Sequence, residues 1–119
     1  MGKLSLTLNG SEVKNIFPAV TIAVSAAASG DEVIIFVLPA ALPVFKKGAY
    51  AELNKKAKHL PDLEEMMDGL EMLGARILIC ELGFDVHGLK EEDLVEGIEV
   101  VGATTFVAEA QGSDLTFSF

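Results

Sequence analysis

Cys80 is the residue with the most distinctive chemistry, because it is the single cysteine of the chain and ends the apolar run RILIC at residues 76–80. Such a run is typical of a buried strand. A helix that begins directly after a thiol favours the nucleophilic thiolate through its partly positive N-terminus. Residues 81–88 can form that helix, although the Glu81 carboxylate would oppose ionisation if it approached the sulfur. A reactive thiol and a buried structural side chain both remain open interpretations of Cys80.

The other titratable residues are weaker candidates. His59 and His87 are the two histidines of the chain, and His87 follows Cys80 along the sequence. A Cys–His catalytic pair is one interpretation of His87, and a surface or cap residue is the other. The acidic runs at residues 64–65 and 91–93 fall where helices begin, and carboxylates there complement the helix dipole. We expect no metal site, and a single cysteine excludes a Cys-based zinc or iron–sulfur centre within one subunit.

The composition and net charge exclude two classes of partner. Half of the 119 residues are hydrophobic, which is typical of a globular domain. Eighteen acidic residues against nine basic ones give a formal charge of −9 at pH 7. General nucleic-acid binding and anionic-membrane binding both need a basic surface, so we expect neither.

Localisation is indicated by the apolar stretches and the cysteine content. The two most apolar stretches, residues 16–28 and 33–45, are shorter than the roughly 20 residues of a membrane-spanning helix. We therefore expect no membrane span, and residues 1–10 do not have the pattern of a signal peptide. A lone thiol is more typical of a reducing cytoplasm than of a secreted protein, and we expect a cytoplasmic location.

Basic residues are concentrated in residues 46–58, at Lys46, Lys47, Lys55, Lys56 and Lys58. A solvated surface is the simplest interpretation of this segment. The alternative is that it covers Cys80 and attracts an anionic sulfur donor or an acidic partner. The alternative requires the segment to lie beside the thiol in the fold.

Regular alternation of strand and helix patterns predicts an α/β fold. The expected strands are residues 3–8, 33–38, 76–80, 98–101 and 115–119. The expected helices are residues 12–29, 61–74 and 104–111, with shorter helical turns within residues 39–58 and 81–97. Strands separated by helices need crossover connections, so the sheet should be mostly parallel and covered on both faces. We predict one domain over residues 1–119, a three-layer sandwich with a five-stranded sheet in the flavodoxin-like order 2-1-3-4-5.

Sheets of this class bind ligands beyond the carboxyl ends of their strands, where Cys80 is expected. The first strand is followed by Asn9, Gly10 and Ser11, a sparse version of a flavin-phosphate loop. The chain has neither a G-x-G-x-x-G fingerprint nor a P-loop. We therefore expect no cofactor, and a nucleotide- or flavin-binding module is a weaker alternative.

One long stretch carries a family resemblance. Cys80 is followed by the turn GLKEEDL at residues 88–94 and by the strand GIEVVGA at residues 97–103. Upstream, AAASGDEVIIFV at residues 26–37 combines a helix of small residues with a second strand. This pattern resembles the cysteine-bearing branch of the DsrE/DsrF-like family, in which a strand-ending cysteine precedes such a turn and such a strand. The resemblance runs from the first strand to about Ala108.

The resemblance implies a cytoplasmic protein of sulfur relay. Cys80 would then accept a sulfane sulfur, as a persulfide or thiosulfonate, and pass it to a partner thiol such as that of a TusA-like carrier. Cys80 is the one residue to which the resemblance assigns a role, and the protein would be a sulfurtransferase only in relay with a partner. We expect Cys80 to be solvent-reachable on this interpretation. The alternative is a non-catalytic oligomeric scaffold, or a small-ligand-binding module, with a buried structural cysteine.

Self-association is the last expectation. The resemblance implies a homo-oligomer, a trimer or hexamer. The apolar content is also high for a chain of this length, which favours a shared apolar surface. The candidate interface residues are Leu42, Val44, Phe45, Phe117 and Phe119.

Overall fold

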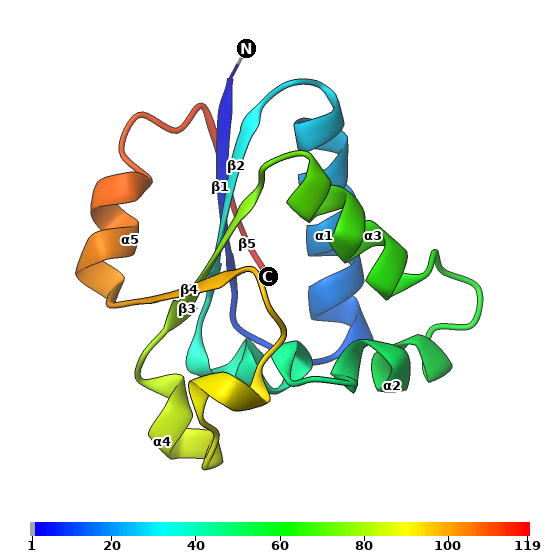
Figure 1. The fold of residues 1–119 in the computed structure, drawn as a ribbon. Coiled ribbons are helices and arrows are strands. Elements are labelled where there is room, and N and C mark those ends of the chain that lie inside the picture. Colours follow the sequence, from blue (N-terminus) through cyan, green and yellow to red (C-terminus); the bar gives the residue numbers. More distant parts are fainter. Residues whose placement is uncertain (1) are drawn as a thin grey trace.

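The computed structural model, which describes residues 2–119, is a five-stranded parallel sheet with helices on both faces (Figure 1). The strands are β1 (Lys3–Leu8), β2 (Glu32–Val37), β3 (Arg76–Cys80), β4 (Ile98–Val101) and β5 (Leu115–Ser118). The α-helices are α1 (Val13–Ala28), α2 (Ala49–Lys55), α3 (Leu63–Met72), α4 (Gly83–His87) and α5 (Ala103–Glu109). Two 3-10 helices, η1 (Pro39–Phe45) and η2 (Glu91–Asp93), lie in the connections after β2 and α4. The predicted three-layer α/β class is confirmed.

The strand order is β4-β3-β2-β1-β5, so the expected order 2-1-3-4-5 is corrected. From β1 to β4 the chain steps in one direction across the sheet, and right-handed crossovers then place α1 and α3 on the same face. The expected order would have reversed direction after β2 and moved α3 to the opposite face. The return from β4 to β5 crosses the whole sheet, and α5 lies on the other face (Figure 1).

The face under α1 and α3 holds most of the buried apolar side chains. Alternate residues of β1, Leu4, Leu6 and Leu8, point to this face, and each is 1% exposed. Small residues let α1 lie close to the strands, and α3 adds an apolar stripe beside it. Burying this shared cluster is the main stabilising contribution to the fold, because apolar burial dominates folding free energy.

The opposite face carries a smaller cluster under a single short helix. Its buried members are Ile34, Phe36, Leu78 and Cys80. None of the residues of α5, which covers this face, is itself buried. The two faces of the sheet are therefore covered unequally.

Polar contacts anchor the C-terminal end of α5 to the strands. Arg76, at the start of β3, donates from Nε and Nη2 to the two carboxylate oxygens of Glu99, each over 3.0 Å. Its Nη1 donates over 3.0 Å to Glu109, in the last turn of α5. The Arg76 guanidinium lowers the pKa of the Glu99 carboxyl below its ordinary value, chiefly through these hydrogen bonds. The network joins β3, β4 and α5.

We predict that Arg76→Gln lowers the free energy of unfolding at neutral pH by about 1 kcal/mol, the scale of partly exposed ion pairs. The folded-state pKa of Glu99 is lowered, so its stabilising contribution is present above the ordinary value of 4.5 and disappears as the pH falls through the folded-state pKa. Urea unfolding of wild type and variant should therefore give a difference in the free energy of unfolding that becomes smaller at acid pH.

Lys55→Gln is the matched control, because its ion pair with Glu52 is 71% and 72% exposed at the two side chains. That variant should change the unfolding free energy little at any pH. A constant Arg76→Gln deficit from neutral to acid pH would contradict the role of the Glu99 carboxylate.

Candidate functional site

Cys80 ends β3 at the carboxyl edge of the sheet, as the sequence predicts. It pairs with Val101 of β4, and the backbone N–H of Glu81 donates to the Val101 carbonyl over 3.1 Å. This edge is where parallel sheets of this class bind their ligands. The backbone around the thiol is thus held in place by its neighbouring strand.

The thiol is buried within the chain, with 2% of the residue exposed, so the expectation of a solvent-reachable Cys80 is wrong for this conformation. Alternation along β3 points Leu78 and Cys80 toward the α5 face. Phe106 of α5 packs against the cluster that includes Cys80, and its ring stacks on Phe36 with centroids 4.6 Å apart and planes 6° apart. Phe106 was not predicted from the sequence to lie at the site. The signal available was one aromatic residue in an otherwise small and polar helix, ATTFVAE.

A helix follows Cys80, but it begins at Gly83 after an intervening turn. Gly83 lets α4 lie close on η1: a Cβ there would be 2.8 Å from Leu42 Cδ2 and 3.3 Å from Pro39 Cα. The helix is therefore seated on the segment after β2, and its dipole does not start at the sulfur.

The two histidines do not join Cys80. His87 Nε2 donates to the Pro39 carbonyl over 2.6 Å, so the ring fastens α4 to η1. The Cys–His pair proposed as one interpretation of His87 is not formed in this arrangement. His59 is exposed in the turn that follows α2.

The lysine-rich segment lies at the carboxyl edge of the sheet but not over the thiol. Lys46 forms an antiparallel bridge with Leu94, and the Lys47 N–H donates to the Asp93 carbonyl over 2.9 Å. Helix α2 then packs against η1 and α3, on the face opposite α5 (Figure 1). The expectation that residues 46–58 cover Cys80 is therefore wrong, because the Cys80 side chain points to the other face.

Three of the expected interface residues are also core residues. Leu42, Val44 and Phe45 of η1 are 0%, 5% and 1% exposed, so they fill the space below α1 instead of forming a free surface. Phe117 and Phe119 are half-buried and stack on each other with centroids 6.2 Å apart. The apolar content of the η1 segment thus belongs to the core of one chain.

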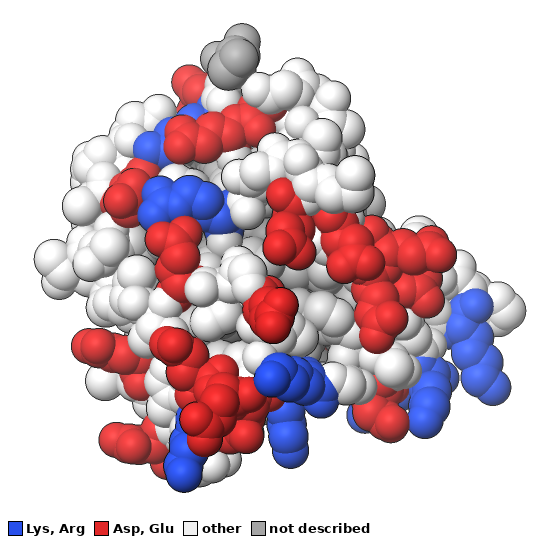
Figure 2. Space-filling view, viewed as in Figure 1, with Lys and Arg blue, Asp and Glu red and all other residues white. Residues whose placement is uncertain are grey.

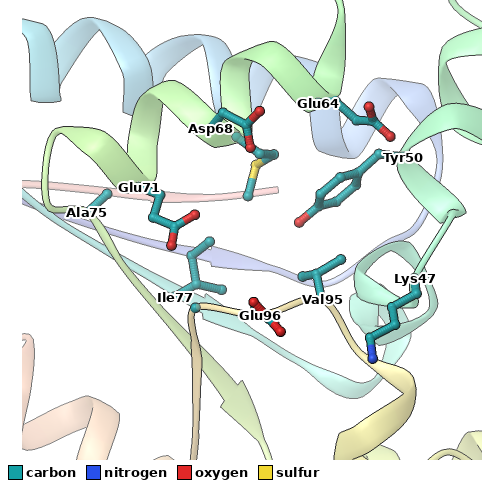
Figure 3. A pocket seen from close by; sticks show the side chains of 11 residues that line it. Lys47, Tyr50, Glu64, Asp68, Glu71, Ala75, Ile77, Val95 and Glu96 are labelled. Carbon is teal, nitrogen blue, oxygen red and sulfur yellow. The ribbon is translucent and has the colours of Figure 1, made fainter.

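A pocket of about 370 Å³ lies between α2, α3 and the loop before β4, away from Cys80 (Figure 3). Its charged and polar lining consists of Lys47, Tyr50, Glu64, Asp68, Glu71 and Glu96. Burial raises the pKa of the Tyr50 hydroxyl, and the Asp68, Glu71 and Glu64 carboxylates raise it further. This negative surface repels anions, and Figure 2 shows acidic side chains over the same part of the molecule.

This pocket was not predicted from the sequence, because it forms only where the carboxylates of α3 lie beside Tyr50 of α2 and Glu96 of the loop before β4. Its one early signal was the acidic excess of the second half of the chain. Within residues 2–119, no group of three or more His, Cys, Asp and Glu side chains is arranged to hold a metal ion. No helix in the same range is both long and apolar enough to cross a membrane.

Sequence comparison places this architecture among known proteins. The chain matches the DsrE/DsrF/DrsH-like family over residues 46–117, more than half of its length. Uncharacterized protein MJ0989 of Methanocaldococcus jannaschii is 30% identical over 103 residues, which cover 87% of this chain and 85% of that protein. Uncharacterized protein MJ0760 of the same organism is 35% identical over 54 residues, which cover 44% of this chain and 20% of that protein.

Solved structures share the whole fold at low sequence identity. The ychN protein from E. coli superposes with a TM-score of 0.78 at 16% identity, with 100% of both chains covered. MTH1491 from Methanobacterium thermoautotrophicum, a protein of unknown function, gives a TM-score of 0.76 at 12% identity, with 98% of this chain and 99% of that chain covered. Together with the sequence matches, which include the segment around Cys80, these findings show that the chain belongs to the DsrE/DsrF/DrsH-like family.

Proposed function

We propose that this protein is a sulfur carrier of the sulfurtransferase type, in which Cys80 accepts a sulfane sulfur and passes it to a partner thiol. Family membership supports a role related to sulfur relay. The observation that carries the finer proposal is the position of the one thiol of the chain. It lies at the carboxyl end of β3, below a helix that has no buried residue of its own.

The chemistry needs one thiolate and no redox cofactor. The Cys80 thiolate attacks the outer sulfur of a donor persulfide, the donor S–S bond breaks, and the donor leaves as a thiolate. Cys80 then carries a persulfide, and the acceptor thiolate attacks its outer sulfur and releases the Cys80 thiolate. Each step exchanges one S–S bond for another, so the two steps together involve no net oxidation.

Small anionic sulfur species can load the same thiol. Attack on the sulfane sulfur of thiosulfate breaks the sulfur–sulfur bond, leaves a persulfide and releases sulfite. Attack on a central sulfur of tetrathionate breaks the central S–S bond, leaves a Cys–S–S–SO3⁻ thiosulfonate and releases thiosulfate. The mass of the adduct therefore distinguishes the persulfide, which a persulfide donor or thiosulfate leaves, from the thiosulfonate that tetrathionate leaves.

We predict that native protein gains one adduct on Cys80 when it is incubated with polysulfide, thiosulfate or tetrathionate, as measured by intact mass spectrometry. Cys80→Ser should keep its circular dichroism spectrum, because the two side chains are close in size, and should gain no adduct. A native protein that all three donors leave unmodified, but that iodoacetamide labels after unfolding, would favour the scaffold or ligand-binding alternative with a structural cysteine.

An exposed apolar pair next to the site is the proposed docking surface for a partner. Leu82 and Val86 of the α4 region are each 68% exposed and are accompanied by the exposed acids Glu81 and Asp85. Leu82 and Val86 come two and six residues after Cys80 in the chain, and acidic side chains also gather in the region of α4 and η2 (Figure 2). The charge pattern is complementary to a small thiol carrier, such as a TusA-like protein, with a basic rim around an apolar centre.

We predict that the double variant Leu82→Glu, Val86→Glu loads sulfur from polysulfide at the wild-type rate but transfers it to a TusA-like carrier at least about tenfold more slowly. The physical reason is loss of apolar contact at an interface centre. Met72→Glu is the control, because Met72 is 87% exposed on α3, away from the thiol. Equal transfer rates for the double variant and the control would exclude this surface as the docking site.

A cytoplasmic location and self-association are further parts of the proposal. The free thiol supports the location, and family membership supports the self-association. The edge strand β5 offers Leu115, which is 52% exposed, near the half-buried Phe117 and Phe119. We predict a homo-oligomer, a trimer or a hexamer, when mass is measured by light scattering at micromolar concentration. Leu115→Lys should shift the mass toward that of one chain, and a wild-type monomer would contradict the prediction.

A further inference from the structure

Helix α5 is fastened to the sheet mainly at its C-terminal end. Beyond the Arg76–Glu109 contact, the Lys3 ammonium donates to the Glu109 and Gln111 carbonyls, the latter over 2.9 Å. The Ser5 and Ser113 hydroxyls are hydrogen-bonded over 2.7 Å, just after the helix. These contacts lie at the amino-terminal edge of the sheet, where β1 and β3 begin.

The N-terminal end of α5 is held by much less. It follows Val101 and Gly102 at the carboxyl edge, and its first three residues, Ala103, Thr104 and Thr105, are all exposed. Phe106 is the α5 side chain that packs into the small cluster, where it stacks on Phe36. Apart from the link to β4 through Gly102, one aromatic contact thus holds this part of α5 on the sheet.

The same aromatic contact closes the cluster that buries the thiol. Cys80 and Phe36 are both 2% exposed, and the side chains packed over their cluster are Leu38, Val101 and Phe106. Leu38 and Val101 belong to segments hydrogen-bonded to β1 and β3, whereas Phe106 belongs to the loosely held helix. Phe106 is therefore the member of this cover whose own backbone is not hydrogen-bonded to the sheet.

We propose that Phe106 is a gate over Cys80: α5 tilts between its link to β4 at Gly102 and its anchored C-terminal end, the Phe36–Phe106 stack separates, and the thiol becomes accessible. This gate rests on the proposed function, since it explains how a buried thiol meets a sulfur donor. The large cluster under α1 and α3 lies on the other face of the sheet and keeps its contacts during the motion. Such local opening needs less free energy than global unfolding.

The test measures how fast iodoacetamide alkylates Cys80 in the folded protein at increasing urea concentrations below the unfolding transition. Opening that exposes only the small cluster gives a rate that changes little with urea, because little surface is exposed. Phe106→Ala should raise this rate at least about fivefold, the scale expected from losing a stacked aromatic pair and its apolar burial. Its dependence on urea should stay shallow.

Val107→Ala is the matched control, because Val107 is the next residue of the same helix, is 56% exposed and is not part of the small cluster. It should alkylate within about twofold of wild type, as expected for a surface substitution. Phe106→Leu keeps apolar cover without the stack and should fall between wild type and Phe106→Ala. If Phe106→Ala does not fold, Phe106→Leu tests in its place whether loss of the stack speeds alkylation of Cys80.

Two results would overturn the gate. One is a wild-type rate that rises with urea as steeply as global unfolding, which would mean that Cys80 opens only when the chain unfolds. The other is equal acceleration by the Phe106 and Val107 variants. Sulfur loading is measured separately: loading with no Phe106 effect rejects the gate alone, whereas a gated thiol that no sulfur donor modifies rejects the proposed function alone.

Discussion

Unequal cover on the two faces of one parallel sheet is the constraint on which the rest of the structure depends. Strands β1 to β4 are added in one direction, so right-handed crossovers collect α1 and α3 on one face and leave the other to the short return helix α5. The first face can bury a large apolar cluster. The second buries a small one, and Cys80 belongs to it.

The fold class was predictable from the sequence because its strong signals are local. Continuous apolar runs such as VIIFV in β2 and RILIC in β3 need cover on both faces, and the intervening helix patterns require parallel strands. Strand order was not predictable, because it depends on which face α3 takes. The apolar stripe of Leu63, Met67 and Leu70 does not itself specify a face, because the face of α3 follows from the direction in which β3 is added to the sheet.

The position of Cys80 in the fold was predictable from the sequence, but its surroundings were not. The place of Cys80 follows from a strand that ends in a thiol, and the sheet edge follows from the fold class. Its burial involves Phe106, a residue distant in sequence that packs on the cluster of Cys80 from α5, in the connection between β4 and β5. The expectation that the lysine-rich segment covers Cys80 was wrong for a related reason. The sequence places the segment and the thiol at the same edge of the sheet, but it does not specify on which face the segment lies.

The two apolar clusters lie on opposite faces of the sheet, and only the smaller one contains Cys80. Leu4, Leu6 and Leu8 belong to the larger cluster on the face away from the Cys80 side chain, whereas Ile34, Phe36 and Leu78 are buried together with the thiol. A TM-score of 0.78 at 16% identity shows how far sequence varies on this scaffold while the fold is kept. Chemistry on such a fold has to be argued from the groups around one thiol, because the shared sheet is compatible with many reactions. For this chain those groups are the Phe36–Phe106 stack, which belongs to the cluster that buries Cys80, and the exposed Leu82, which comes two residues after Cys80 in the chain.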